Sequence, residues 1–325
     1  MDKTMKMEMM VASTVTYRYN FQKSFVDNKG KKNSLREELI DGEKGLYFKF
    51  LHVKNKALIS KELDDFYNKA SEETRLEKGM GIFEFERIKE LIEQHISKPN
   101  STIIDIGGGT GKYAEWLAKN GHTVHLVEPV LKHIKLAENR AKKLKKPFSV
   151  AIGEAKKIPF KDNTADLVIL HGPLYHLQKR EDRIAAIREA KRVLKKDGII
   201  LGFAINATAS TVVGLMNGMI HANSFFDMCK EELTTGLHDA PKDFPFLLAD
   251  AYYHKPQGLK KEFLEQNLHF INIFAVEGMI WLDNEYFANM LDKKKSKTLK
   301  VLQNLTQNDE YLLPFSPHMM IAVKK

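Results

Sequence analysis

The chain has 325 residues, of which 43% are hydrophobic and 29% are charged, and its formal net charge is +9. The length exceeds one average domain, and this share of apolar residues is enough for a packed core, which excludes a disordered chain. The one cysteine, Cys229, excludes a disulfide framework. Because no apolar run approaches membrane-spanning length, we expect a cytoplasmic protein without a membrane partner.

Residues 1–58 differ in pattern from the rest of the chain and are expected to form an N-terminal extension. Their apolar and polar residues alternate, and turn-forming residues at 27–30 and 41–45 separate the candidate strands. The pattern predicts a small antiparallel sheet, although residues 36–38 could equally lie on a short helix. Such an extension could be an added module, a dimerisation edge or a cover over the main domain.

Residues 59–95 have the apolar spacing of helices. Leu63, Phe66 and Tyr67 fall on one helical face, and a second apolar face follows between residues 83 and 92. We therefore expect helices directly before the first strand of the main domain.

A glycine-rich turn follows the first predicted buried strand, residues 102–106. Glycines stand at positions 107, 108, 109 and 111, before a helix predicted at 113–119, so a ligand can approach the backbone without meeting a Cβ. The dinucleotide-binding fingerprint fails because its third glycine would be Lys112, and a phosphate-binding P-loop fails at Ile106 and Tyr113. The next strand, 123–127, ends in Glu128, where a doubly wound fold presents an acid to ribose hydroxyls.

These residues indicate a nucleoside-cofactor site. The pattern of Ile103, Ile104, Asp105 and the alternating glycines resembles the first motif of the class I S-adenosylmethionine-dependent methyltransferases. The resemblance implies an α/β fold, with a Rossmann-like, doubly wound, mostly parallel seven-stranded sheet spanning 59–325. It also implies a helical cap inserted at about 206–255, and S-adenosyl-L-methionine as cofactor, with S-adenosyl-L-homocysteine as product.

The resemblance extends to the third and fourth strands. Glu154-Ala155 occupies the place of the family's Gly-Asp-Ala acid, which faces the adenine amino group; here the acid is Glu instead of Asp. Helices before the first strand resemble the family's lid, so Tyr67, and less strongly Arg75, are candidates for the methionine end of the cofactor. The predicted cofactor-binding residues are Tyr67, Asp105, Gly107, Gly108, Gly109, Gly111, Glu128, Pro129, Glu154, Ala155 and His171.

The strand predicted at 166–170 ends in His-Gly-Pro-Leu-Tyr-His-Leu, residues 171–177, which resembles one bacterial branch of these methyltransferases. The carboxyl ends of central strands face the ligand crevice, so this loop should lie near the transferred methyl group. His171, His221, His238 and His254 are candidate bases that the sequence does not rank, and His171 and His254 are taken as the catalytic residues. Tyr175, His176 and His221 are the candidate substrate-binding residues, although a structural role is favoured for His176.

The remaining elements complete the expected domain. A helix is predicted at 183–194 and a fifth strand at 199–205; two last strands, 269–275 and 318–323, should pair antiparallel around a helix at 284–306. Apolar residues of the cap insertion could line a pocket or form a core of their own. Cysteines and histidines show no metal-ligand spacing, so no metal is expected.

We therefore expect an S-adenosylmethionine-dependent methyltransferase that moves a methyl group to a small molecule by direct displacement. One alternative is an RNA methyltransferase, for which lysine-rich segments at 132–146 and 293–300 would provide contacts, although such segments are more often solvated helix faces. Another is a non-catalytic regulatory protein that binds the same cofactor. The sequence leaves open whether the protein is a monomer or a homodimer.

Overall fold

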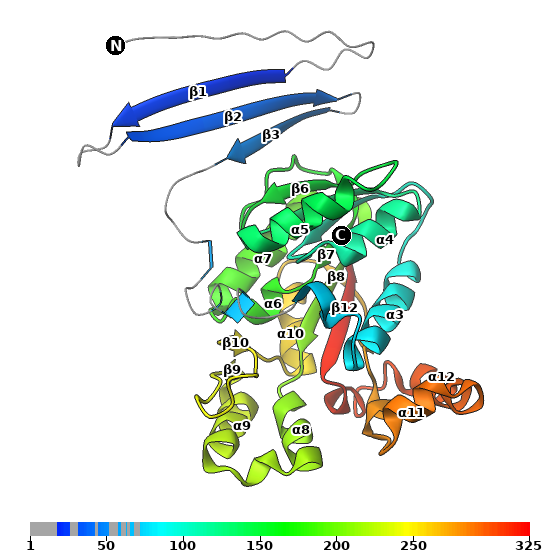
Figure 1. The fold of residues 1–325 in the computed structure, drawn as a ribbon. Coiled ribbons are helices and arrows are strands. Elements are labelled where there is room, and N and C mark those ends of the chain that lie inside the picture. Colours follow the sequence, from blue (N-terminus) through cyan, green and yellow to red (C-terminus); the bar gives the residue numbers. More distant parts are fainter. Residues whose placement is uncertain are drawn as a thin grey trace.

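In a computed structural model, the described residues are 18–26, 32–42, 45–51, 58, 59, 63, 66, 67 and 72–325. Strands β1 (Arg18–Val26), β2 (Lys32–Gly42) and β3 (Gly45–Leu51) form an antiparallel sheet in the order β1-β2-β3 (Figure 1). This is the segment for which the sequence predicts antiparallel strands. The predicted turn at 27–30 and part of that at 41–45 lie outside the described residues.

The main sheet has seven strands in the order β11-β12-β8-β7-β4-β5-β6. Strands β8, β7, β4, β5 and β6 run parallel, whereas β12 is antiparallel to both β8 and β11, which confirms the predicted mostly parallel, seven-stranded fold. The strands are β4 (Thr102–Ile106), β5 (Thr123–Glu128), β6 (Ser149–Ile152), β7 (Ala165–Leu170), β8 (Leu194–Ile205), β11 (His269–Ala275) and β12 (His318–Lys324).

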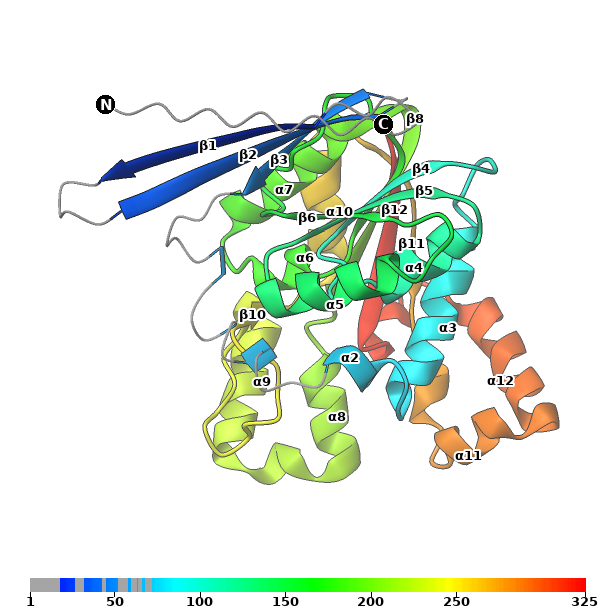
Figure 2. The same cartoon turned by 45° about the horizontal axis from the view of Figure 1, so that its top comes forward.

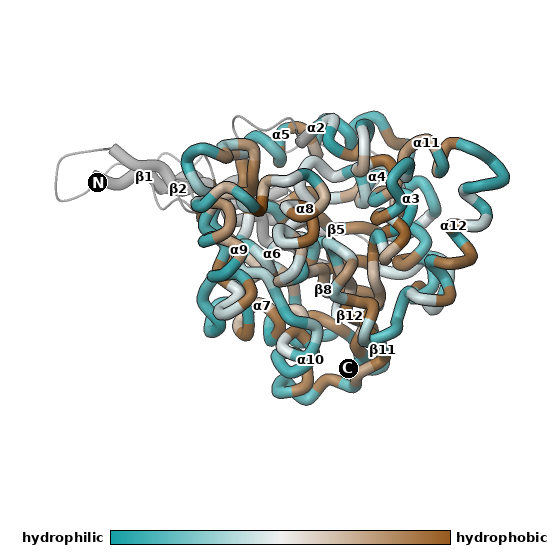
Figure 3. Tube along the Cα trace, turned by 90° about the horizontal axis from the view of Figure 1, so that it is seen from below, coloured by the Kyte–Doolittle hydropathy of each residue, from teal (hydrophilic) through white to brown (hydrophobic). Residues whose placement is uncertain are grey.

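Helices cover both faces of this sheet (Figure 2). One face packs against α3 (Met80–Glu93), α4 (Lys112–Lys119) and α5 (Leu131–Ala141), and the other against α7 (Arg180–Val193) and α10 (Pro256–Leu264). Side chains of a strand point alternately to its two faces, so Ile103 packs with the first group of helices while Ile104 and Ile106 pack with the second. Figure 3 shows hydrophobic strands β5, β8 and β12 between the helices.

The cap insertion contains α8 (Ala209–Asn217), η1 (Met219–His221), α9 (Asn223–Thr235) and a short hairpin of β9 (Leu237–His238) with β10 (Ala251–Tyr252). Phe225, Met228 and Cys229 are buried against one another and against Phe244. These residues form a small core within the insertion, whereas Met216, Phe226 and Phe246 are exposed.

The helix predicted at 284–306 is divided into α11 (Tyr286–Leu291) and α12 (Lys293–Thr306). Asp292 has an extended backbone between them, and its carboxylate accepts hydrogen bonds from the N–H groups of Lys294 and Lys295. It therefore acts as the N-cap of α12, a role that aspartate commonly fills. Over the described parts of the chain, we find no helix whose length and apolar character would let it traverse a membrane.

Four short elements complete the described fold: α2 (Glu72–Arg75) precedes α3, α6 (Pro173–His176) follows β7, and the 3-10 helices η2 (Met279–Leu282) and η3 (Leu313–Phe315) flank α11 and α12 in sequence. Helix α6 begins directly after the carboxyl end of β7. The loop that the sequence singles out therefore lies at the ligand-facing edge of the parallel strands.

Candidate functional site

The glycine turn between β4 and α4 brings bare backbone to the edge of a cavity. Gly107 and Gly109 have φ angles of +77° and +55°, which residues with a Cβ rarely adopt. A Cβ on Gly107 would stand 2.6 Å from the backbone oxygen of His171, whereas one on Gly109 would meet nothing within 4 Å. Gly107 thus packs closely against the loop after β7, and Gly109 borders open space in the cavity.

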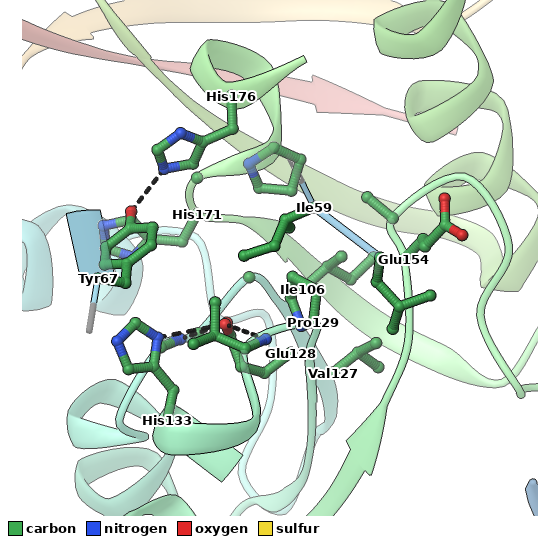
Figure 4. A pocket seen from close by; sticks show the side chains of 18 of the residues that line it. Ile59, Tyr67, Ile106, Val127, Glu128, Pro129, His133, Glu154, His171 and His176 are labelled. Carbon is green, nitrogen blue, oxygen red and sulfur yellow. Dashed lines mark hydrogen bonds and ion pairs between the residues drawn. The ribbon is translucent and has the colours of Figure 1, made fainter. Parts of the chain in front are cut away.

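Glu128, at the end of β5, holds this turn in place. Its Oε2 accepts a hydrogen bond of 3.0 Å from the Gly109 N–H, and its Oε1 accepts one of 3.0 Å from the Val130 N–H. His133 Nδ1 lies 3.2 Å from the same Oε1 (Figure 4). A carboxylate has about four lone-pair positions, so Oε2 keeps one for a ligand. The carboxylate lines the cavity, as the sequence predicts for a sugar-binding acid.

Asp105 does not line the cavity, contrary to its predicted place among the cofactor contacts. Its side chain is 0% exposed and lies beneath the turn, where a Cβ on Gly108 would approach its Oδ2 to 2.3 Å. Neither carboxylate oxygen has a hydrogen-bond partner among the described residues. Burial, with a smaller contribution from the charge of Glu128, raises the pKa of Asp105 to about 7. Strand alternation directs this side chain toward α4 instead of the ligand.

Gly111 also stands outside the cavity lining. It is the N-cap of α4 and packs inward, since a Cβ there would lie 3.0 Å from Phe148 and 3.1 Å from Ala137. The other predicted residues do come together around the cavity: Tyr67, Gly107, Gly108, Gly109, Glu128, Pro129, Glu154, Ala155, His171, Tyr175 and His176. Arg75 lines it as well, with its guanidinium paired to Glu84 at 2.7 Å.

A hydrogen bond crosses the cavity between Tyr67 and His176. The Tyr67 hydroxyl lies 2.6 Å from His176 Nε2 (Figure 4). Burial lowers the pKa of His176 to about 3, so the ring is neutral, and its tautomer decides whether Nε2 donates or accepts this hydrogen bond. The Tyr67 ring also meets the His133 ring edge-on at a centroid distance of 4.9 Å. The segment before α2 is thereby joined to the loop after β7.

His171 presents a neutral ring to the cavity. Burial lowers the pKa of this histidine to about 4. The ring stacks on Phe203 at a centroid distance of 4.6 Å and lies 4.7 Å from the Tyr113 ring. Within the described part of the chain, neither His171 Nδ1 nor the Tyr113 hydroxyl has a hydrogen-bond partner, and both residues line the cavity. These two groups are therefore buried polar atoms in the wall of the cavity without a partner among the residues described.

Three of the candidate histidines lie elsewhere. His254 is buried, with its Nε2 3.4 Å from Glu262, and it does not line the cavity, so the structure does not bring it together with the other predicted site residues. His221 ends η1 on the exposed outside of the cap and is likewise not a cavity residue. His238 is buried in the cap, with its Nδ1 2.6 Å from Glu232.

His133 lines the cavity, and the sequence analysis missed it. The available signal was its position five residues after Glu128, in the first turn of α5, whose N-terminus follows β5 directly. A side chain in that place has to face the same edge of the sheet as the acid.

One cluster of possible metal ligands occurs among the described residues. Ligand atoms of Glu84, Glu277 and His318 lie within 4.8 Å of one another. The Glu84 carboxylate is paired with Arg75, and that of Glu277 with His318 Nδ1 at 2.6 Å. The carboxylates are thus neutralised by protein cations, and the group is an ion-pair cluster beside the cavity.

The sequence matches known methyltransferases in its central part. The family described as "Methyltransferase domain" matches residues 104–202. The chain is 31% identical over 117 residues to the probable tRNA methyltransferase 9B of Mus musculus, a match that covers 35% of this chain and 24% of the relative. It is 35% identical over 107 residues to a ubiquinone/menaquinone biosynthesis C-methyltransferase of Cupriavidus taiwanensis. This match covers 32% of this chain and 43% of the relative. The chain thus spans less than half the length of these relatives.

Solved structures share the fold over a longer stretch. A SAM-dependent methyltransferase from Methanosarcina mazei superposes with a TM-score of 0.51 at 17% identity, covering 72% of this chain and 96% of its own. A protein from Pyrococcus horikoshii OT3 superposes with a TM-score of 0.52 at 13% identity, covering 80% of this chain and 98% of its own. The family match places a methyltransferase domain at residues 104–202, and the sheet order and the solved structures show the fold of S-adenosylmethionine-dependent methyltransferases.

Proposed function

We propose that this protein binds S-adenosylmethionine in the cavity and transfers its methyl group to a small molecule. The observation that carries the proposal is the open backbone at Gly109 beside the Glu128 carboxylate, at the carboxyl ends of β4 and β5. The space next to Gly109 is open because glycine has no side chain, and this space can take an adenosyl group. The edge of the sheet where strand order reverses is the usual ligand site of doubly wound folds.

Two acids supply specificity for the nucleoside. The remaining lone pair of Glu128 Oε2 accepts a hydrogen bond from a ribose hydroxyl, while the amide donors and His133 keep the carboxylate fixed. Glu154, beyond β6, offers an acceptor to the adenine amino group. Lys156 Nζ lies 3.6 Å from the Glu154 carboxylate.

His171 and Tyr113 orient the acceptor. When bound, S-adenosylmethionine supplies a methyl group on a positively charged sulfur. The acceptor lone pair forms the new bond to the methyl carbon as the carbon–sulfur electrons return to sulfur. His171 Nδ1 accepts a hydrogen bond from the acceptor, and the Tyr113 hydroxyl donates one. Because the pKa of His171 is only about 4, it directs the nucleophile without storing its proton, which passes to water. Such alignment can supply ~7–11 kcal/mol.

The hydrogen bond between Tyr67 and His176 supports a small acceptor over a polynucleotide. It joins two lining residues from separate segments of the chain and so limits the size of an acceptor that can enter on this side. An RNA acceptor is the second candidate, because the mouse relative is named as a probable tRNA methyltransferase. The third is a binding protein without transfer activity.

Transfer of a labelled methyl group distinguishes these three functions. The protein is incubated with S-adenosylmethionine carrying a tritiated methyl group and with either the small-molecule fraction or the RNA fraction of a cell extract. Label in the small-molecule fraction supports the proposal, and label in RNA supports the second candidate. Calorimetric binding without label in either fraction supports the third.

Cofactor binding is tested on Glu128. Glu128→Gln keeps the side-chain volume but removes the charge and one acceptor oxygen, so it should weaken the calorimetric affinity for S-adenosylmethionine at least about tenfold. Glu181→Gln makes the same exchange at an exposed position of α7 and should leave the affinity unchanged. Equal affinities for both variants would refute the assignment of the site.

A further inference from the structure

Helix α12 carries basic and apolar side chains on its outer face. Lys294, Lys297, Val301 and Leu305 follow one another at intervals of three or four residues, so they lie along one face of the helix. On the opposite face Gln303 is buried, and its amide donates hydrogen bonds to the backbone oxygens of Val276 and Glu277. In Figures 1 and 2, α11 and α12 stand out from the side of the domain, where a flat surface can reach them.

The apolar side chains on this outer face are strongly exposed. Leu305 is 75% exposed and Val301 is 54% exposed. Leu291, at the end of α11 and two residues before α12, is 79% exposed. Exposed apolar side chains that gather on one element, instead of being scattered, mark an interaction surface.

The charge of α12 indicates what kind of surface it meets. Residues 293–306 contain five lysines, at 293, 294, 295, 297 and 300, and no acid. Asp292 is occupied in capping the helix, and Asp309 and Glu310 follow only after its end. Four of the lysines lie in the first half of the helix, and the exposed Val301 and Leu305 lie in the second, so the helix suits a partner that offers both negative charge and hydrocarbon.

We propose that α12 docks this protein on an anionic lipid surface. The lysines would meet the headgroups, and Leu291, Val301 and Leu305 would enter the boundary with the acyl chains. RNA offers phosphates, but aliphatic side chains cannot stack on bases as aromatic ones do. The absence of a spanning segment, on which we based the expectation of no membrane partner, does not bear on a helix that lies in the interface. The inference does not depend on the proposed methyl transfer.

Sedimentation with vesicles tests the proposal. The whole protein is mixed with vesicles of phosphatidylcholine alone, or of phosphatidylcholine with an equal amount of phosphatidylglycerol, and the bound fraction is measured. Binding should require phosphatidylglycerol and weaken with added salt. Because each lysine near such a surface changes the affinity about fivefold, the double variant Lys294→Glu, Lys297→Glu should bind at least about 25-fold more weakly. Val301→Ser with Leu305→Ser should also weaken binding, at unchanged charge.

Two comparisons can overturn the proposal. The matched variant Lys142→Glu, Lys143→Glu makes the same charge change on the exposed end of α5, and it should lose only a small part of the binding. An equal loss would mean that net charge alone attracts the protein. Absence of vesicle binding, or tighter binding of bulk tRNA that depends on Lys294 and Lys297, would refute a lipid partner. Circular dichroism of each variant establishes that α12 remains folded.

Discussion

Replacing Asp105 with asparagine should raise the free energy of unfolding at alkaline pH and change this free energy less at acidic pH. The carboxylate is 0% exposed and has no hydrogen-bond partner among the described residues, and its pKa is raised from 3.8 to about 7. Between these two values the folded protein keeps a proton that the unfolded chain has lost. The free energy of unfolding therefore falls as the pH rises from about 4 to about 7. At about 1.4 kcal/mol per pKa unit, the full cost of the ionised group is ~4 kcal/mol.

Urea unfolding of the parent and the Asp105→Asn variant near pH 5 and near pH 8 measures this cost. About two thirds of it accrues between these pH values, so the variant should gain ~2–3 kcal/mol relative to the parent over the interval. Every other titrating group is common to both proteins and cancels in the difference. The comparison near pH 5 controls for packing, because asparagine has nearly the shape of the protonated acid. Parallel pH profiles would mean that the carboxylate is ionised and paired in the folded protein, and the reasoning would fail.

Three further predictions follow from contacts around the cavity. Gly108→Ala places a Cβ within 3 Å of a buried carboxylate and should lower the free energy of unfolding by ~1–3 kcal/mol in urea, whereas Gly258→Ala, with open space around its Cβ, should not lower it. Tyr67→Phe removes the hydroxyl that bonds the loop after β7 and should weaken calorimetric cofactor affinity about fivefold; an unchanged affinity would mean that the bond does not cover the ligand. Burial lowers the pKa of His318, but the Glu277 carboxylate more than offsets this and raises it to about 9. The stability from that pair is full below about pH 6.5 and is lost as the pH rises through about 9, so His318→Gln should flatten the decline seen in thermal melts between these values.

Much of the fold could be predicted because its signals are local. The buried strand at 102–106, the glycine turn and the acid after the next strand are adjacent in sequence, and parallel strands bring their carboxyl ends to one edge. This rule also explains why Glu128, Glu154 and His171, which follow three different strands, line one cavity. Helix boundaries were less predictable, as the division at Asp292 shows, because capping depends on one side chain and not on periodicity.

Among the predicted site residues, Asp105 and His254 do not line the cavity. A sequence motif does not say toward which face of the sheet a side chain points. The motif places Asp105 next to the glycines, but the alternation of the strand turns its side chain to the same face as Ile103, away from the ligand. His254 is buried with its ring beside Glu262, and it is not among the residues that line the cavity. Neither outcome could be derived without knowing which elements pack on each face.

The hydrogen bond between Tyr67 and His176 is weak enough to break and form again in each catalytic cycle. The hydroxyl of Tyr67 and the ring of His176 join segments 109 residues apart in sequence, and both are neutral groups. A neutral hydrogen bond contributes about 0.5–1.5 kcal/mol net, so this bond by itself would leave the open form populated at roughly one part in three to one part in ten. Ligand entry and product release therefore need no large activation for this contact.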